Sequence, residues 1–170
     1  ITKLSTVNGL SEIGISCISS NKSQNALLVA YNSSNMDLIK NSEIINISSI
    51  INSSIIGDKT IYNLYSHSKY IYVCTGFGIV VVDLDKEEIK DTYIIGALSS
   101  QLKVKDIHIS NDTIYALTED EIKYAPLNNG FLSNSSVWSS HDLPNGSQID
   151  QLESFGNDFF AFGSSKTIFK

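Results

Sequence analysis

The chain has 170 residues, enough for one domain, and 42% of them are hydrophobic, enough for a sizeable core. Its formal net charge is −6, and all twelve of its basic residues are lysines. Without arginine it cannot clamp phosphate or guanine in bidentate fashion, so we expect no nucleic-acid partner. No apolar run approaches the roughly 18 residues of a membrane span. Without an initiator methionine or a signal peptide, the chain is expected to be a mature or excised portion of a longer protein.

Short β-branched and aromatic runs between glycine-containing or polar turns predict an all-β chain of four-stranded antiparallel meanders. The clearest meander lies within Thr60–Ile95, where four such runs follow one another. In chain order we expect an end strand at 2–5, meanders at 14–47, 61–95 and 104–142, and a partial meander at 149–170. A single sheet of this kind cannot cover both of its faces, so the sheets are expected to stack on one another.

The meanders repeat at a nearly constant spacing. Runs of three apolar residues that begin at 27, 71, 114 and 159 align with one another, at offsets of 44, 43 and 45 residues. A four-stranded repeat of about 40–50 residues predicts the blades of a β-propeller. The alternative is a sandwich or barrel with coincidental spacing. We expect the four blades to belong to a larger propeller, although the end strand could instead complete the last blade and close a ring of four.

The motifs that usually carry catalysis or metal binding are missing or incomplete. Gly76-Phe77-Gly78 lacks the strand-to-helix context of a phosphate loop, and Asp83-x-Asp85-x-Glu87 lacks the glycine and closing glutamate of a calcium loop. The three histidines show no ligand spacing, and no nucleophile elbow is present. The two cysteines, Cys17 and Cys74, occupy non-equivalent positions and are expected to be buried thiols. The sequence therefore predicts no enzyme, no metal and no cofactor.

One end of the blades is the candidate binding face. In an up-and-down blade, the turn between the second and third strands lies at the same end as the connector that enters the first strand, and loops on a rigid scaffold are common binding sites. The candidate binding residues at this end are Asp58, Lys59, Phe77, Glu119, Asp120 and Glu121, beside turns at 32–35 and 164–166. Phe77 either contacts a partner protein or a glycan, or folds back over the neighbouring blade.

Several stretches resemble the N-terminal propeller of the PorZ family. They are Asn8–Ser11 with Ile13–Ser16, Met36–Asn41, Ile56–Ile61 and above all Gly76–Gly96, GFGIVVVDLDKEEIKDTYIIG. The likeness extends from Thr2 to about Ala125. It implies a component of the type IX secretion system of Bacteroidetes, exported to the periplasm or the outer-membrane cell surface. The family's partners would be the sortase PorU and the attachment-complex subunits PorV and PorQ. The role implied is a non-enzymatic scaffold that assists the anchoring of secreted cargo to anionic lipopolysaccharide.

Two further features of the sequence bear on this resemblance. The chain is acidic and lacks arginine, so we expect any lipopolysaccharide to be bound through parts of the protein outside this chain. The glycine-aliphatic third strand that ends in aspartate, Gly78–Leu84, also resembles the sensor propellers of hybrid two-component regulators. The alternative function is therefore a ligand-sensing propeller of such a regulator.

Overall fold

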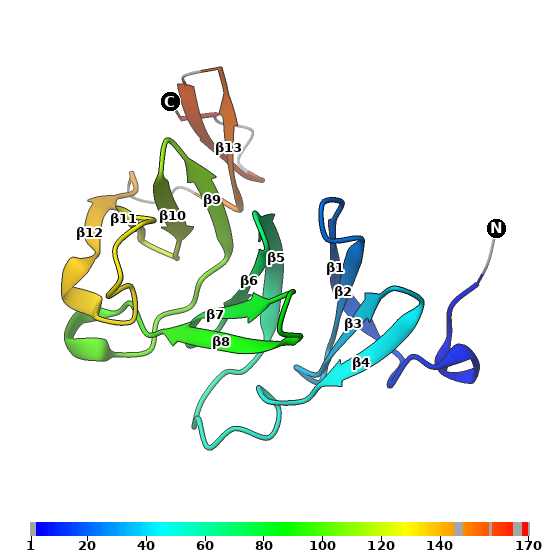
Figure 1. The fold of residues 1–170 in the computed structure, drawn as a ribbon. Helices are drawn as coiled ribbons and strands as arrows, with labels where there is room; N and C mark the ends of the chain where they lie inside the picture. The colour runs from blue at the N-terminus through cyan, green and yellow to red at the C-terminus, as the bar shows by residue number, and fades with distance from the viewer. Residues whose placement is uncertain (1–2, 145–147, 157, 165–167, 170) are drawn as a thin grey trace.

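In the computed structural model, which describes residues 3–144, 148–156, 158–164 and 168–169, the chain forms four antiparallel β-sheets arranged in an arc (Figure 1). The prediction of an all-β chain built from propeller blades is confirmed. Helical structure in the described residues is limited to three 3₁₀ turns of three residues each, η1 (Thr6–Asn8), η2 (Ala97–Ser99) and η3 (Ser135–Val137). No helix in this part of the chain is long and apolar enough to cross a membrane.

Each blade is a simple meander, in which consecutive strands pair side by side. Blade 1 comprises β1 (Ile15–Asn21), β2 (Ala26–Tyr31), β3 (Met36–Lys40) and β4 (Glu43–Ile47), and blade 2 comprises β5 (Ile61–His67), β6 (Tyr70–Thr75), β7 (Gly78–Asp83) and β8 (Glu88–Tyr93). Blade 3 comprises β9 (Asp106–Ser110), β10 (Thr113–Leu117), β11 (Glu121–Pro126) and β12 (Ser139–Asp142), and blade 4 comprises β13 (Gln151–Phe155), β14 (Asp158–Phe162) and β15 (Ile168–Phe169). The expected end strand is not formed by its described residues, 3–5, which lie outside any strand.

The repeat found in the sequence corresponds to the strand register. In every blade, an apolar residue of the first strand pairs directly with the last residue of the aligned apolar run on the second strand. The four partner pairs are Ile18–Val29, Leu64–Val73, Ile107–Ala116 and Leu152–Ala161. A one-residue shift would turn each of these side chains to the other face of its sheet, so the shared register places equivalent residues on equivalent faces of the blades.

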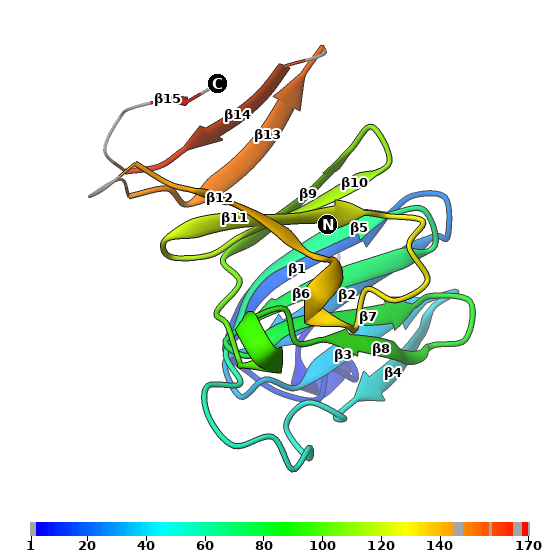
Figure 2. The same ribbon diagram turned by 90° about the vertical axis from the view of Figure 1, so that its left-hand side faces the viewer.

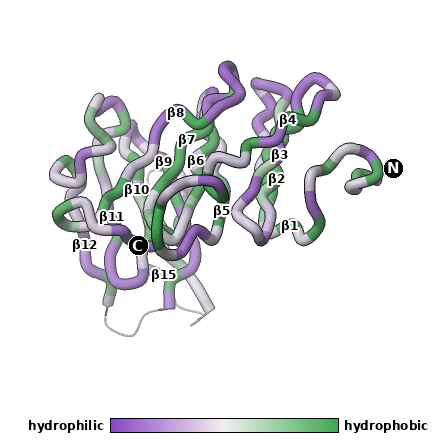
Figure 3. The backbone as a smooth tube through the Cα atoms, turned by 90° about the horizontal axis from the view of Figure 1, so that it is seen from below, coloured by the Kyte–Doolittle hydropathy of each residue, from purple (hydrophilic) through white to green (hydrophobic). Residues whose placement is uncertain are grey.

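The blades stack face to face, with their first strands β1, β5, β9 and β13 as successive neighbours. One hydrophobic cluster lies between each pair of adjacent blades: Leu38 and Val73 belong to the first, Val81 and Ile114 to the second, and Leu152 to the third. Figure 3 shows the corresponding pattern along the backbone, where hydrophobic residues are concentrated in the strands. This radial stacking confirms the propeller prediction over the sandwich alternative.

The arc of blades is open in this chain. Figures 1 and 2 show blade 1 and blade 4 at its two ends. Large apolar side chains are exposed on both terminal blades, with Ile18 of blade 1 at 60% and Phe155 of blade 4 at 81% exposure. The closed ring of four is therefore not formed by the described residues.

Candidate functional site

The predicted meeting of turns and connectors at one end of the blades, here called the turn face, is present in blades 2 and 3. The backbone N–H of Gly76, in the turn between β6 and β7, donates to the carbonyl of Thr60, just before β5, at 3.2 Å. The same turn motif recurs: the Thr75 hydroxyl donates to the Gly78 carbonyl at 2.8 Å, and the Thr118 hydroxyl to the Glu121 carbonyl at 2.7 Å. These two turns are thus structural equivalents.

A chain of polar contacts joins blades 2 and 3 across this face. The Asp58 carboxylate accepts hydrogen bonds from the Thr60 backbone N–H at 2.9 Å and the Tyr62 hydroxyl at 2.6 Å. The Lys103 ammonium lies 4.6 Å from the centre of the Tyr62 ring and 3.1 Å from a carboxylate oxygen of Glu119. Two predicted site residues, Asp58 and Glu119, are thereby connected through a lysine that stacks on a tyrosine.

The contacts in this chain favour the carboxylate form of Asp58, the neutral form of Tyr62 and the ammonium form of Lys103. Hydrogen bonds from Thr60 and Tyr62 hold the pKa of Asp58 below its ordinary value, with a smaller contribution from the charge of Lys103. The hydrogen bond to Asp58 raises the pKa of Tyr62, and the bond to Glu119 raises the pKa of Lys103. Asp58 and Glu119 are exposed and Lys103 is partly exposed, so these groups organise the surface and contribute little to stability.

The other predicted charged residues are brought to the same end with separate partners. Lys59 turns away and donates to the carbonyls of Ile51 and Ser53 at 3.1 and 2.8 Å. Glu121 forms an ion pair with Lys123 at 3.1 Å. The Asp120 side chain is exposed and makes no bond to another described residue. Glu12 holds the turn at 32–35 through hydrogen bonds. Positions 165 and 166 of the last turn lie outside the described residues.

Phe77 is not available as a surface contact. Its side chain is completely buried, at 0% exposure, in the cluster between blades 1 and 2. The prediction of an exposed binding aromatic is therefore wrong, and the alternative in which Phe77 folds back over the neighbouring blade is confirmed. The reason is geometric: Gly76 and Gly78 let the turn pass close to neighbouring backbone, which directs the ring between the two sheets.

Gly78 is expected to be essential for this turn. Its φ of +143° is disfavoured for other residues, and an added Cβ would lie 2.2 Å from the carbonyl oxygen of Tyr93. We expect Gly78→Ala to lower the free energy of unfolding by about 1–3 kcal/mol or more, since both backbone strain and the steric clash must be relieved. Urea denaturation measures this change. Gly130→Ala is the control, because a Cβ there meets nothing within 4 Å, and an equal loss in the two variants would contradict the prediction.

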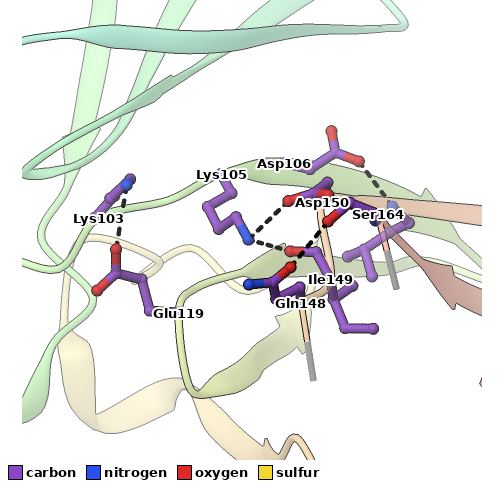
Figure 4. Close-up of polar contacts among 9 residues, drawn as sticks. Lys103, Lys105, Asp106, Glu119, Gln148, Ile149, Asp150 and Ser164 are labelled. Atoms are coloured by element: carbon purple, nitrogen blue, oxygen red, sulfur yellow. Dashed lines mark hydrogen bonds and ion pairs between the residues drawn. The ribbon is translucent and has the colours of Figure 1, made fainter. Parts of the chain in front are cut away.

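Further polar links cross between blades 3 and 4 at the same end, as Figure 4 shows. Lys105 forms an ion pair with Asp150 at 3.2 Å and donates to the carbonyl of Ile149. Asp150 also accepts a bond from the backbone N–H of Ser164 at 3.1 Å, so connector and turn are again joined. Lys103, Lys105 and Asp150 were not predicted as site residues. Each lies in the connector just before the first strand of its blade, as Asp58 does, so the repeat applied to the connectors predicts them as well.

The described residues offer no cluster of possible metal ligands. No three His, Cys, Asp or Glu side chains gather there as possible metal ligands. His108 is bonded to the Ser154 hydroxyl at 2.9 Å, and burial lowers its pKa. Both cysteines are free thiols, and burial raises the pKa of each; Cys74 is fully buried, whereas Cys17 is only partly so.

Comparison with known proteins agrees with this architecture. The chain resembles a solved structure of PorZ from Porphyromonas gingivalis, described as an essential bacterial surface component of the type IX secretion system. That likeness has 24% sequence identity and a TM-score of 0.83, and it covers 97% of this chain and 22% of PorZ. The chain thus spans about a fifth of the length of that protein. A search of curated sequences gives no match.

Two other propellers share the fold at lower identity. One is the extracellular domain of the hybrid two-component system BT3049 from B. thetaiotaomicron, with 15% identity, a TM-score of 0.71, and 98% of this chain and 24% of that chain covered. The other is the WD40 propeller of Doa1, with 20% identity, a TM-score of 0.65, and 91% and 49% covered. The family model for the N-terminal β-propeller domain of PorZ matches residues 1–139. With most of its length matched in this way, the chain belongs to the family of PorZ N-terminal β-propeller domains of the type IX secretion system.

Proposed function

We propose that this chain is a non-enzymatic scaffold propeller of the type IX secretion attachment complex, and that it docks partner subunits through its turn face. The family match over residues 1–139 carries the proposal. Within this assembly the propeller assists a sortase in anchoring secreted cargo to anionic lipopolysaccharide, at the periplasmic side or the outer surface of the outer membrane. The likeness to the two-component sensor, at 15% identity, concerns the fold alone and does not favour the sensing alternative.

The charge of the chain indicates which partner each part of the protein binds in this proposal. A surface without arginine and with a net charge of −6 does not attract an anionic polymer over long range, so lipopolysaccharide is assigned to other parts of the protein. The turn face instead offers fixed polar groups to a protein partner. Glu119 and Asp120 are both exposed, and Lys103 holds the first of them in place. Charged groups around an interface increase the rate and the specificity of association more than they increase affinity.

Charge reversal on the turn face tests the proposal. In the full-length protein, the double change Glu119→Lys and Asp120→Lys is expected to reduce co-purification with the attachment-complex subunits while the melting temperature stays unchanged. The expectation follows because both side chains are exposed and lysines would repel a positively charged partner surface.

A matched control lies at the opposite end of blades 1 and 2. The double change Glu43→Lys and Glu87→Lys also reverses two negative charges and also removes one lysine ion pair, that between Glu87 and Lys40. It is expected to leave co-purification intact. Partner recovery that is equal to wild type in both double variants would contradict a docking role for the turn face.

A further inference from the structure

A second candidate binding site lies away from the turn face, in a cavity of about 300 Å³ between blade 2 and the loop that follows β11. We call it the tyrosine pocket, after Tyr70, Tyr72 and Tyr93; its other polar lining residues are His67, Ser68, Lys90, Asp91 and Asn129. The loop after β11 passes beside the strands of blade 2 in Figure 2. None of the side chains of these lining residues takes part in the contacts described above for the turn face.

Two tyrosine hydroxyls in this pocket are buried without a protein partner. The side chains of Tyr72 and Tyr93 belong to residues that are each only 4% exposed. Neither hydroxyl forms a hydrogen bond within the described part of the chain. Burial raises the pKa of Tyr72 to about 12 and raises the pKa of Tyr93 as well, so both hydroxyls stay protonated and able to donate. Buried polar groups nearly always have a partner, either protein or ordered water, so these two hydroxyls are available as donors to a ligand that enters the cavity.

The walls of the pocket are held rigidly. The indole N–H of Trp138 donates to the Leu132 carbonyl at 2.8 Å, and the Trp138 ring lies 6.4 Å from that of Tyr93. Leu132 and Trp138 are both buried in the cluster between blades 2 and 3. The loop wall is therefore fixed before any ligand arrives, which reduces the entropic cost of binding.

The charges at the pocket select an uncharged ligand. The Lys90 ammonium lies 4.6 Å from the centre of the Tyr70 ring, and the Asp91 carboxylate stands beside it in the sequence. The lining thus contains one positive and one negative side chain and no excess of either sign, so a buried charge on the ligand would gain little while losing its hydration. One oxygen of Asp91 accepts the backbone N–H of Thr92 at 2.8 Å, and the other oxygen remains an acceptor. The pocket thus presents both donors and an acceptor.

The surroundings of the pocket offer contacts to a ligand larger than a small molecule. Lys90, Asp91 and Tyr93 lie on β8, the outermost strand of blade 2, which pairs with β7 on one side only. An unpaired strand edge can accept an extended peptide as an additional strand. On the opposite wall, Phe131 is 71% exposed next to the lining of the pocket, and exposed aromatic side chains are common anchors at protein interfaces.

We propose that the tyrosine pocket and the free edge of β8 together bind an extended segment of a partner protein that inserts an asparagine or glutamine side chain into the pocket. The carboxamide oxygen accepts hydrogen bonds from the Tyr72 and Tyr93 hydroxyls. Its N–H₂ group donates to the free oxygen of Asp91. The backbone of the segment pairs with β8, and Phe131 packs against a neighbouring side chain. The site goes beyond the proposed function, because it lies on other residues and does not depend on the turn face.

The experiment uses the full-length protein and a display library of random seven-residue peptides. Peptides are selected on the wild type alone, and the affinity of each recovered clone is then measured on the wild type and on the double variant Tyr72→Phe and Tyr93→Phe. The expected clones carry asparagine or glutamine at one fixed position and lose affinity about tenfold or more on the double variant, since two hydrogen bonds disappear. Tyr124→Phe, which removes a hydroxyl elsewhere on blade 3, is the control and should keep full affinity.

Stability distinguishes binding from a structural role. Since the two hydroxyls have no protein partner, the double variant is expected to melt at the same temperature as the wild type or higher. A clear decrease in melting temperature would show that they serve the fold and would overturn the proposal. Clones that bind wild type and double variant equally would overturn it too. Methyl glycosides are added as competitors. Displacement of the selected peptides from the pocket by a glycoside would also overturn the proposal, because the ligand would then be a sugar.

Discussion

Replacement of Phe77 by alanine is expected to lower the free energy of unfolding by about 3–5 kcal/mol, the usual cost of truncating a buried phenylalanine. The ring is fully buried among residues of two blades, including Met36 and Leu38 of blade 1 and Val80 of blade 2. A cavity between two sheets collapses poorly, because each sheet is held by its own backbone ladder, so the loss should lie in the upper part of this range. Urea denaturation followed by circular dichroism measures it.

Phe131→Ala provides the comparison for this variant. Phe131 is 71% exposed, and its truncation should change stability by no more than about 0.5 kcal/mol. Because Phe77 stabilises the stacking of blades 1 and 2, its truncation should not weaken partner binding per folded molecule. Lost partner binding at unchanged stability would mean that the side chain is exposed in solution, contrary to the structure.

The second large effect is expected at Asp106, whose carboxylate joins three blades. The residue is 4% exposed at the start of β9. It accepts bonds from the Asn63 side chain of blade 2 at 2.7 Å, from the Leu152 backbone N–H of blade 4 at 2.8 Å, and from the Ile107 backbone N–H of its own strand at 2.8 Å. Asp106→Asn places an N–H₂ group against one or more of these donors. We expect a loss of about 2–4 kcal/mol, because buried donors are left without an acceptor.

The same carboxylate predicts a pH dependence. Burial raises the pKa of Asp106, and the hydrogen bonds from Leu152, Asn63 and Ile107 offset this only in part. The folded state therefore holds the proton to a higher pH than the unfolded state does. The contribution of Asp106 to the free energy of unfolding consequently decreases as the pH rises from its unfolded pKa, about 3.9, through its folded pKa. Above the folded pKa the contribution is constant. His108 lies nearby, but burial lowers its pKa and favours its neutral form.

Denaturation of the wild type and Asp106→Asn between pH 4 and neutral pH tests both statements. The stability difference between the two proteins should be largest at the acid end and become smaller as pH rises. Asp120→Asn is the control, because this exposed carboxylate has no bond to another described residue, and it should match the wild type at each pH. A difference that grows with pH would show that the pKa of Asp106 is lowered by its donors and would contradict the prediction.

The sequence by itself determined the blades. Alternation of apolar and polar residues, turn-forming residues and a repeat of 43 to 45 residues depend on neighbours along the chain, and meander strands pair with their sequence neighbours. For the same reason the end of the blade that carries Asp58 and Glu119 could be predicted from strand order. Residues 3–5 were predicted less well, because a short segment forms a strand only if a sheet edge is there to pair with it.

What the tertiary structure alone decided is how one blade meets the next. Phe77 looks exposed in sequence, at a hairpin tip between two glycines, and only the proximity of blade 1 buries it. Asp106 looks like an ordinary strand-end carboxylate until Asn63 and Leu152 approach it from two other blades, 43 and 46 residues away. The unused hydroxyls of Tyr72 and Tyr93 are likewise visible only after the loop of blade 3 has covered them. Contacts between blades join residues far apart in sequence, and a pattern of local hydrogen bonding and hydrophobicity contains no information about which of them will meet.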